Sequence, residues 1–176
     1  MKKTNDNMTI GSLPLNMLIF SIPLVFSNLL QILFNMCDIA VVGKFAGSLS
    51  LGAVGSAATL VTLFTGIVIG IGSGVNVLTA RYLGENSQDK VMKTVHSSLF
   101  ICFFAGIILM ICGIVFAKPM LRLFNTREEL LDGAALYIRI YFLGMPALGI
   151  YNFGNAVLSA SGDTRRPLVY LSIAGI

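Results

Sequence analysis

The chain is a succession of long apolar runs separated by short polar joints. Four of these runs are long enough to cross a bilayer, which takes about 20 mostly apolar residues in a helix, and a fifth opens near the end of the sequence. Charged residues make up only 11% of the chain and hydrophobic residues 56%, whereas a water-soluble domain carries about 25% charged residues. Long alternating strand patterns are absent from the sequence. The sequence therefore predicts an all-α, multi-pass transmembrane helical bundle in the lipid bilayer.

Polar joints divide the chain into an N-terminal segment, residues 1–14, which we expect in the cytoplasm, and five predicted spans at residues 15–42, 51–78, 95–117, 130–160 and 167–176. The first run is too long for a signal peptide and lacks a small-residue cleavage site, so we expect it to be retained. The fifth is cut off after about ten residues, which is too short to cross a membrane. We therefore expect this chain to be the N-terminal piece of a longer protein.

Lysine and arginine are unevenly shared between the two sides of the predicted bundle. The loops on the side of the N-terminus carry seven of the twelve, and the opposite loops carry five. Because positive residues favour the cytoplasmic side, this bias predicts a cytoplasmic N-terminus in the plasma or inner membrane of the cell.

Several function classes receive little support from the composition. The net charge is +4 and the basic residues are scattered, so no nucleic-acid partner is expected. The three cysteines lie inside apolar runs without CxxC spacing, and His96 is the single histidine, so we predict neither a metal site nor a haem site. No cofactor is expected. Paired catalytic residues are not visible within the spans, and we do not expect an enzyme.

One carboxylate, Asp38, lies near the end of the first apolar run. Gln31, Asn35 and Asp38 are spaced so that on a helix they fall within about 60° of one another and form a polar stripe facing protein or water. An ionised carboxylate inside a span costs roughly 2.5 to 3.5 kcal/mol or more, so a sequence that carries one usually uses it. Alternatively, Asp38 marks the helix end, where water solvates it. The apolar stretch IAVVG that follows favours a position inside the span, which makes Asp38 a candidate proton- or cation-binding residue.

Prolines and glycines interrupt the apolar runs. Pro23 and Pro146 lie inside the first and fourth spans, where each removes one backbone hydrogen bond and is expected to bend its helix. The small-xxx-small spacing of Gly66, Gly70 and Gly74 predicts close packing against another helix.

Two amides, Asn152 and Asn155, follow Pro146 in the fourth run. Amides in hydrocarbon must find partners, so these two either join helices or contact a ligand. In the joint before this run, Thr126 is predicted to cap the next helix, with Glu129 completing a capping box.

The order of these features resembles the N-terminal part of the multidrug and toxic compound extrusion (MATE) family. The resemblance rests on "SIPLVFSNLLQILFNMCDIAVVGKFAG", a glycine-rich second span, "ARYLGENSQDKV" and "LYIRIYFLGMPALGIYNFGNAVLSASGDTRRPL", and runs from about Gly11 to Pro167. It implies that residues 15–176 form part of the N-terminal lobe of a two-lobe transporter with about twelve helices. The remainder of the same chain would supply the second lobe.

The resemblance also implies an activity, that of a secondary active antiporter that exports organic, often cationic, small molecules while protons or sodium ions move inward. The family's cation site is centred on an aspartate of the first helix, which corresponds to Asp38. A proline lower in that helix, proposed in some members to bend when the aspartate is protonated, corresponds to Pro23. Asn155, and less directly Asn152, correspond to polar partners of this site.

Two alternatives stay open. A lipid-linked oligosaccharide flippase of the related superfamily shares the lobes and the glycine-rich spans. Its cavity for anionic headgroups should carry inward-facing arginines, whereas the arginines here lie at predicted helix ends. A membrane-embedded enzyme or a redox-complex subunit would need paired catalytic or ligand residues within the spans, which this sequence does not show.

Overall fold

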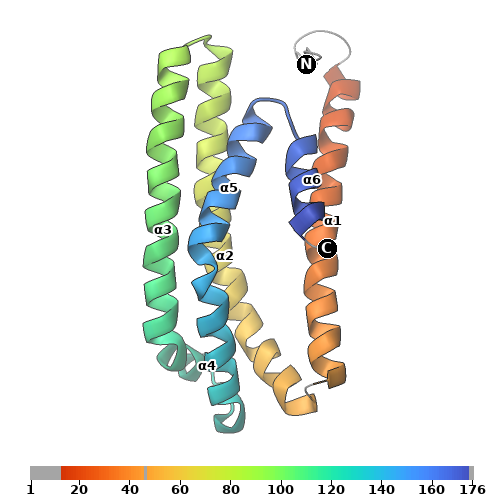
Figure 1. The fold of residues 1–176 in the computed structure, drawn as a ribbon, viewed down its shortest axis with the longest axis vertical. Helices are drawn as coiled ribbons and strands as arrows, with labels where there is room; N and C mark the ends of the chain where they lie inside the picture. Colours follow the sequence, from red (N-terminus) through yellow and green to blue (C-terminus); the bar gives the residue numbers. More distant parts are fainter. Residues whose placement is uncertain (1–12, 46, 175–176) are drawn as a thin grey trace.

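The computed structural model describes residues 13–45 and 47–174, and the regular structure in these residues is entirely helical (Figure 1). The helices are α1 (Leu13–Phe45), α2 (Gly47–Gly84), α3 (Gln88–Leu123), α4 (Glu128–Leu143), α5 (Met145–Ala160) and α6 (Arg165–Ala174). The predicted all-α fold is confirmed. The first three helices extend beyond the predicted spans at both ends, and the membrane boundaries within them stay a prediction.

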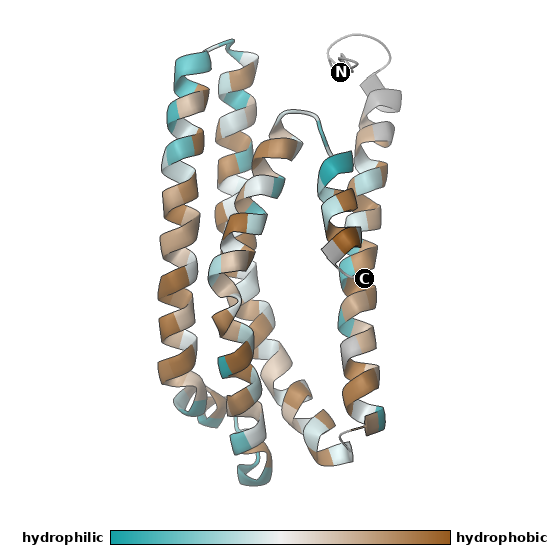
Figure 2. Cartoon of the chain, viewed as in Figure 1, coloured by the Kyte–Doolittle hydropathy of each residue, from teal (hydrophilic) through white to brown (hydrophobic). Residues whose placement is uncertain are grey.

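Three stretches of the described chain are long and apolar enough to cross a membrane: Phe20–Phe45, Gly47–Gly84 and Gln88–Leu123. Helices α4 and α5 together can form a fourth crossing. Figure 2 shows hydrophobic residues along the middle of the long helices and many of the hydrophilic residues near their ends. Large apolar side chains are exposed on all six helices, and this is the surface that lipid would cover.

Helices α2, α3, α4 and α5 pack together, and α1 and α6 lie side by side next to them (Figure 1). The core of the four-helix unit is closed by Leu121, Ile138, Phe142 and Met145, which are almost fully buried. Phe64 of α2 meets the Phe142 ring edge-on, with the centroids 5.0 Å apart, a favourable aromatic geometry. By contrast, only 6% of the apolar stretch of α1 is buried, against 28% for α2. The well-packed unit is therefore α2–α5, and α1 is attached to its side.

A bend of 47° separates α4 from α5 at the point where the sequence has Gly144 and Pro146. The Gly144 amide bonds to the Tyr141 carbonyl at 3.0 Å and closes α4, and the Leu148 amide bonds to the Gly144 carbonyl at 2.9 Å and opens α5. Pro146 has no N–H and fits in the first turn of the new helix. The fourth predicted span is thus two short helices set at an angle.

Glycines let α3 approach the bent pair closely. A Cβ atom added at Gly106 would lie 2.7 Å from the Pro146 Cα, and one added at Gly149 would lie 2.6 Å from the Cys102 carbonyl oxygen, closer than real Cβ contacts. Gly113 lies directly under the Phe142 ring. These three positions bring the backbones of α3 and α4–α5 together at the bend.

The glycine stripe predicted to pack in α2 behaves differently. Nothing in the described part of the chain lies within 4 Å of a Cβ added at Gly66, Gly70 or Gly74, so the expected close packing is not found among the described helices. The packed glycine of this segment is Gly72, which lies against Asn152 of α5. A repeat of small residues marks one side of a helix, but it does not say whether a partner covers that side.

Three helix ends, those of α2, α3 and α5, are closed by the same motif. The second residue after each helix has a positive φ, which is 54° at Asn86 and Asn125 and 85° at Gly162. Asparagine and glycine tolerate this conformation. The next amide bonds back across the turn at 3.0 to 3.1 Å, in the pairs Ser87–Tyr82, Thr126–Leu121 and Asp163–Leu158. The capping box expected at Thr126 and Glu129 is wrong, because Thr126 belongs to this motif and α4 starts after Arg127 without a side-chain cap.

Candidate functional site

Helix α1 carries the three residues of the predicted polar stripe. Gln31 is half-buried and Asn35 is exposed, while the side chain of Asp38 lies outside the described residues although its backbone is part of the helix. The Gln31 side chain lies close enough to the Tyr151 hydroxyl of α5 to interact with it. The side of α1 that bears Gln31 is therefore turned toward α5.

The facing helix α5 carries a second polar stripe. Tyr151, Asn155 and Ser159 are four residues apart and therefore lie on one side of the helix. The Ser159 hydroxyl donates to Asn155 Oδ1 at 3.4 Å. All three are half-buried. Because Tyr151 contacts Gln31, the predicted residue Asn155 is located one turn further along the side of α5 that faces α1.

Asn152, the other predicted amide, is turned toward α2 instead. Its Nδ2 donates to the Leu148 carbonyl of its own helix at 2.9 Å. A Cβ atom added at Gly72 would lie 3.6 Å from the Asn152 Cβ, which is ordinary contact. The two amides that the sequence suggested as a pair therefore serve different neighbours, and only Asn155 belongs to the stripe that faces α1.

Asn76 of α2 was missed by the sequence reasoning. Its Nδ2 donates to the Ala156 carbonyl of α5 at 2.9 Å, across 80 residues of sequence. The signal was present, because Asn76 is the one amide side chain in the apolar, glycine-rich sequence of α2. Nothing in the sequence, however, says that α5 is its partner.

Pro23 lies inside α1, two turns before Gln31, and α1 is one helix across it. The Ser27 hydroxyl donates to the Pro23 carbonyl at 2.9 Å, and Ser27 is buried. Near the same end, the Thr164 hydroxyl at the start of α6 donates to the Phe20 carbonyl at 3.3 Å. The segment around Pro23 is therefore the part of α1 that contacts α6.

Ion pairs are found at the ends of the helices. In the joint between α2 and α3, Glu85 pairs with Arg81 at 3.1 Å and with Lys90 at 3.3 Å, and all three are well exposed. The hydrogen bond from Arg81, followed by the one from Lys90, lowers the pKa of Glu85. At the opposite end, α3 is tied to α4 by the exposed pairs Lys118–Asp132 at 2.7 Å and Arg122–Glu128 at 3.7 Å. Exposed pairs of this kind contribute little to stability.

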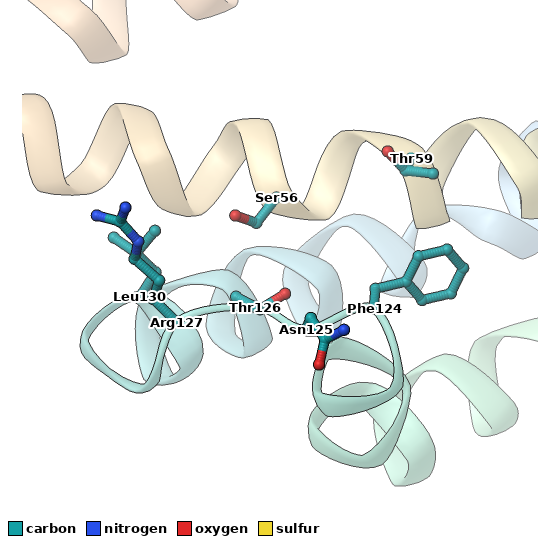
Figure 3. A pocket seen from close by; sticks show the side chains of 7 residues that line it. All are labelled: Ser56, Thr59, Phe124, Asn125, Thr126, Arg127 and Leu130. Atoms are coloured by element: carbon teal, nitrogen blue, oxygen red, sulfur yellow. The ribbon is translucent and has the colours of Figure 1, made fainter.

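In the described part of the chain, no group of three or more His, Cys, Asp and Glu side chains could hold a metal ion. A cavity of about 270 Å³ lies where the joint between α3 and α4 meets α2 (Figure 3). It is lined by Ser56, Thr59, Phe124, Asn125, Thr126, Arg127 and Leu130, none of which belongs to the two polar stripes. The candidate site is therefore formed by the facing sides of α1 and α5, with Gln31 opposite Tyr151, Asn155 one turn further along α5 and Asp38 two turns further along α1.

Comparison with known proteins places this arrangement in a family. The MatE family model matches residues 23–176. The probable multidrug resistance protein YoeA of Bacillus subtilis is 30% identical over 161 residues, which cover 92% of this chain and 35% of that protein. The FAD transporter of Shewanella oneidensis is 26% identical over 167 residues, 95% of this chain and 36% of that protein. The chain thus spans little more than a third of the length of these relatives.

Solved structures agree with the fold. A crystal structure of MATE in the bent conformation matches 99% of this chain and 39% of its own with a TM-score of 0.88 and 23% identity. A MOP superfamily transporter from Pyrococcus furiosus, described as having a binding pocket of reverse polarity that suggests a different function, matches 99% of this chain and 38% of its own with a TM-score of 0.87 and 22% identity. At these identities the likeness establishes the fold.

Proposed function

Because the chain belongs to the MATE family, we propose that it forms part of a secondary active antiporter that exports organic, often cationic, compounds in exchange for inward-moving protons or sodium ions. The family is one of membrane transporters, and relatives named for multidrug resistance or export support efflux as the activity. The chemistry is binding and release, with no covalent bond made. The remainder of a longer chain is expected to supply a second lobe, since the solved relatives are more than twice as long.

The observation that carries the proposal is the proximity of the Gln31 side chain to the Tyr151 hydroxyl, which shows that the stripe of α1 is turned toward a polar stripe of α5. A polar stripe on an apolar helix is stable in a bilayer only when protein or water covers it. Asp38 follows Gln31 by seven residues, so it belongs to the same side of α1. We therefore place the coupling ion at Asp38, on the side of α1 that is turned toward α5. Because α5 runs antiparallel to α1 (Figure 1), Asn155 lies on the other side of the Gln31–Tyr151 contact from Asp38, and we propose that it lines the substrate cavity instead of binding the ion.

In this mechanism Asp38 binds a proton or a sodium ion from one side of the membrane and releases it to the other. Coupling requires that the ion and the exported compound favour different conformations, because a ligand shifts an equilibrium only through its differential affinity for the two states. Helix α1 is suited to respond, since it is the least buried of the long helices and contains Pro23. We propose no organic cofactor and no enzymatic step.

The FAD transporter among the relatives gives a second substrate class to compare with organic cations. FAD is a large anion. Five of the six arginines lie in the joints or near helix ends, and Arg139 is an exposed residue inside α4, so neither stripe contains an arginine, which favours the cationic class.

The experiment uses vesicles that contain the protein at its full native length and a fluorescent organic cation. An imposed proton or sodium gradient should drive transport, and Asp38→Asn should abolish it while membrane insertion stays normal. Asp89→Asn, a change of the same chemistry at an exposed residue in the first turn of α3, is the matched control and should transport like wild type. Wild-type rates in Asp38→Asn would remove Asp38 from the mechanism. FAD in place of the cation tests the other substrate class.

A further inference from the structure

Helices α2 and α5 run in the same direction and touch at two successive turns. Gly72 lies against Asn152, and four residues later on both helices Asn76 donates to the Ala156 carbonyl. The equal spacing means that one row of α2 fits one row of α5 in a fixed register. Figure 1 shows the two helices alongside each other over this length.

The two contacts have different physical characters. The absence of a side chain at Gly72 lets the backbones approach, because a Cβ there would already be in van der Waals contact with Asn152. The close approach at Gly72 does not by itself fix the rotation or the height of α5. The bond from Asn76 Nδ2 is directional and ends on a single carbonyl, so it fixes both the rotation and the height of α5. Such bonds between helices cannot be replaced by water in the hydrocarbon region.

The rotation of α5 decides what faces α1. Ala156 follows Asn155 directly and lies on the buried side of α5, while Asn155 and Tyr151 belong to the stripe on the side of α1. If α5 turned by one residue, about 100°, Tyr151 would lose Gln31.

We infer that Asn76 is a positioning residue, which by donating to the Ala156 carbonyl holds α5 at the rotation and height at which Tyr151 and Asn155 face Gln31. The bond from Asn76 ends on the backbone of α5, so the residue acts on the facing stripes through α5. This inference rests on the proposed function for its consequence in transport, but not for its structural content.

The structural content is tested by a disulfide. The Cβ separation of 3.6 Å at Gly72 and Asn152 lies within the range of natural disulfides, so Gly72→Cys with Asn152→Cys should cross-link on mild oxidation. The three native cysteines are first replaced by alanine, and the protein is studied at full native length in membranes. Adding Asn76→Leu should slow cross-linking by about three- to twenty-fold, the range expected for one interhelical hydrogen bond in a membrane. Asn76→Ala serves if the leucine variant does not fold.

A matched control is Ser73→Ala, which removes a hydroxyl of α2 that bonds to Ile69 of its own helix and should leave the cross-linking rate unchanged. If Asn76→Leu and Asn76→Ala cross-linked as fast as the protein with Asn76, the inference would be overturned. It would also be overturned if Ser73→Ala slowed cross-linking as much as Asn76→Leu.

The functional consequence is tested by the ion dependence of exchange. If the loss of Asn76 misplaces the stripe of α5, Asn76→Leu should raise the half-saturating concentration of the coupling ion by about three- to twenty-fold. The maximal rate per folded protein should stay similar. A defect of folding alone would lower the amount of active protein and leave the half-saturating concentration unchanged, and that result would overturn the positioning role. If the wild-type protein shows no ion-coupled exchange, the proposed function fails, while the cross-linking result still decides whether Asn76 holds α5.

Discussion

The seam between α3 and α5 should tolerate a single methyl group at some glycines and not at others. Gly149 and Gly154 both lie inside α5, but a Cβ at Gly149 would lie 2.6 Å from the Cys102 carbonyl oxygen, whereas a Cβ at Gly154 would have nothing within 4 Å. Contacts of about 3.4 Å are ordinary, so Gly149→Ala must push α3 and α5 apart by roughly 0.8 Å. The atom in the way belongs to the backbone and cannot swing aside.

The magnitude follows from a comparison of the two substitutions. Replacing glycine by alanine in a helix favours the helix by up to about 1 kcal/mol, and this gain is common to both positions and cancels in the difference. Forcing an extra methyl group into a packed interface costs about 1 to 3 kcal/mol, and only Gly149→Ala incurs that cost. We therefore expect Gly149→Ala to be less stable than Gly154→Ala by about 1 to 3 kcal/mol.

The free energy of unfolding of each variant can be measured by denaturant titration of the purified protein in detergent micelles, followed by far-UV circular dichroism. Gly106→Ala, which meets the Pro146 backbone, should resemble Gly149→Ala. The double variant Gly106→Ala with Gly149→Ala should lose less than the sum of the two, because the first methyl already separates the helices that the second would strain. Equal stability of Gly149→Ala and Gly154→Ala would refute the close approach of α3 and α5.

Further predictions concern the site, the topology and the joints. Tyr151→Phe, which removes only the hydroxyl that meets Gln31, should slow ion-driven exchange in vesicles about five-fold, the equivalent of one neutral hydrogen bond; an unchanged rate would separate Tyr151 from the ion site. A membrane-impermeant thiol reagent added outside cells should label a cysteine introduced at 124–130 but not one at 84–90, and the opposite pattern would mean an inverted N-terminus. The lowered pKa of Glu85 means that its ion pairs contribute above the unfolded-state value of about 4.5 and are lost as the pH falls through the folded-state value. The protection factor of the amides in this joint, which is the intrinsic exchange rate divided by the observed rate, should therefore fall on acidification in wild type and stay unchanged in Glu85→Gln.

The fold was predictable because it follows from local constraints that the sequence states directly. Long apolar runs must be helices in a bilayer, since only internal hydrogen bonds can satisfy their backbone there. The bend between α4 and α5 occurs where Gly144 and Pro146 weaken the helix, and the ends of α2, α3 and α5 fall at Asn86, Asn125 and Gly162, whose residue types tolerate a positive φ.

The arrangement of side chains around the site depended on which helices meet, and the sequence does not contain that information in a local form. Asn152 and Asn155 have the same chemistry and are three residues apart, yet one lies against Gly72 and the other belongs to the stripe facing α1. Likewise, the regular spacing of Gly66 and its neighbours marks a narrow side of α2, while the contact is made by Gly72, which is not part of that spacing. Periodicity identifies a side of a helix, but only the packing identifies its partner.

The contrast between α1 and the other long helices links these observations to the proposed transport. Helices α2–α5 are locked together by close glycine contacts and by the Asn76 bond, so moving one of them would break several contacts that neither lipid nor water can replace. A hydrogen bond at Phe20 and a side-chain interaction at Gln31 tie α1 to the rest of the chain, and most of the apolar surface of its described residues is exposed. Displacing α1 in lipid exchanges apolar protein contacts for apolar lipid contacts and sacrifices few hydrogen bonds, so its cost is small. If Asp38 binds the coupling ion as proposed, a change of one charge there would act on the least buried of the long helices, whereas the same change on α2 or α5 would act against a packed unit.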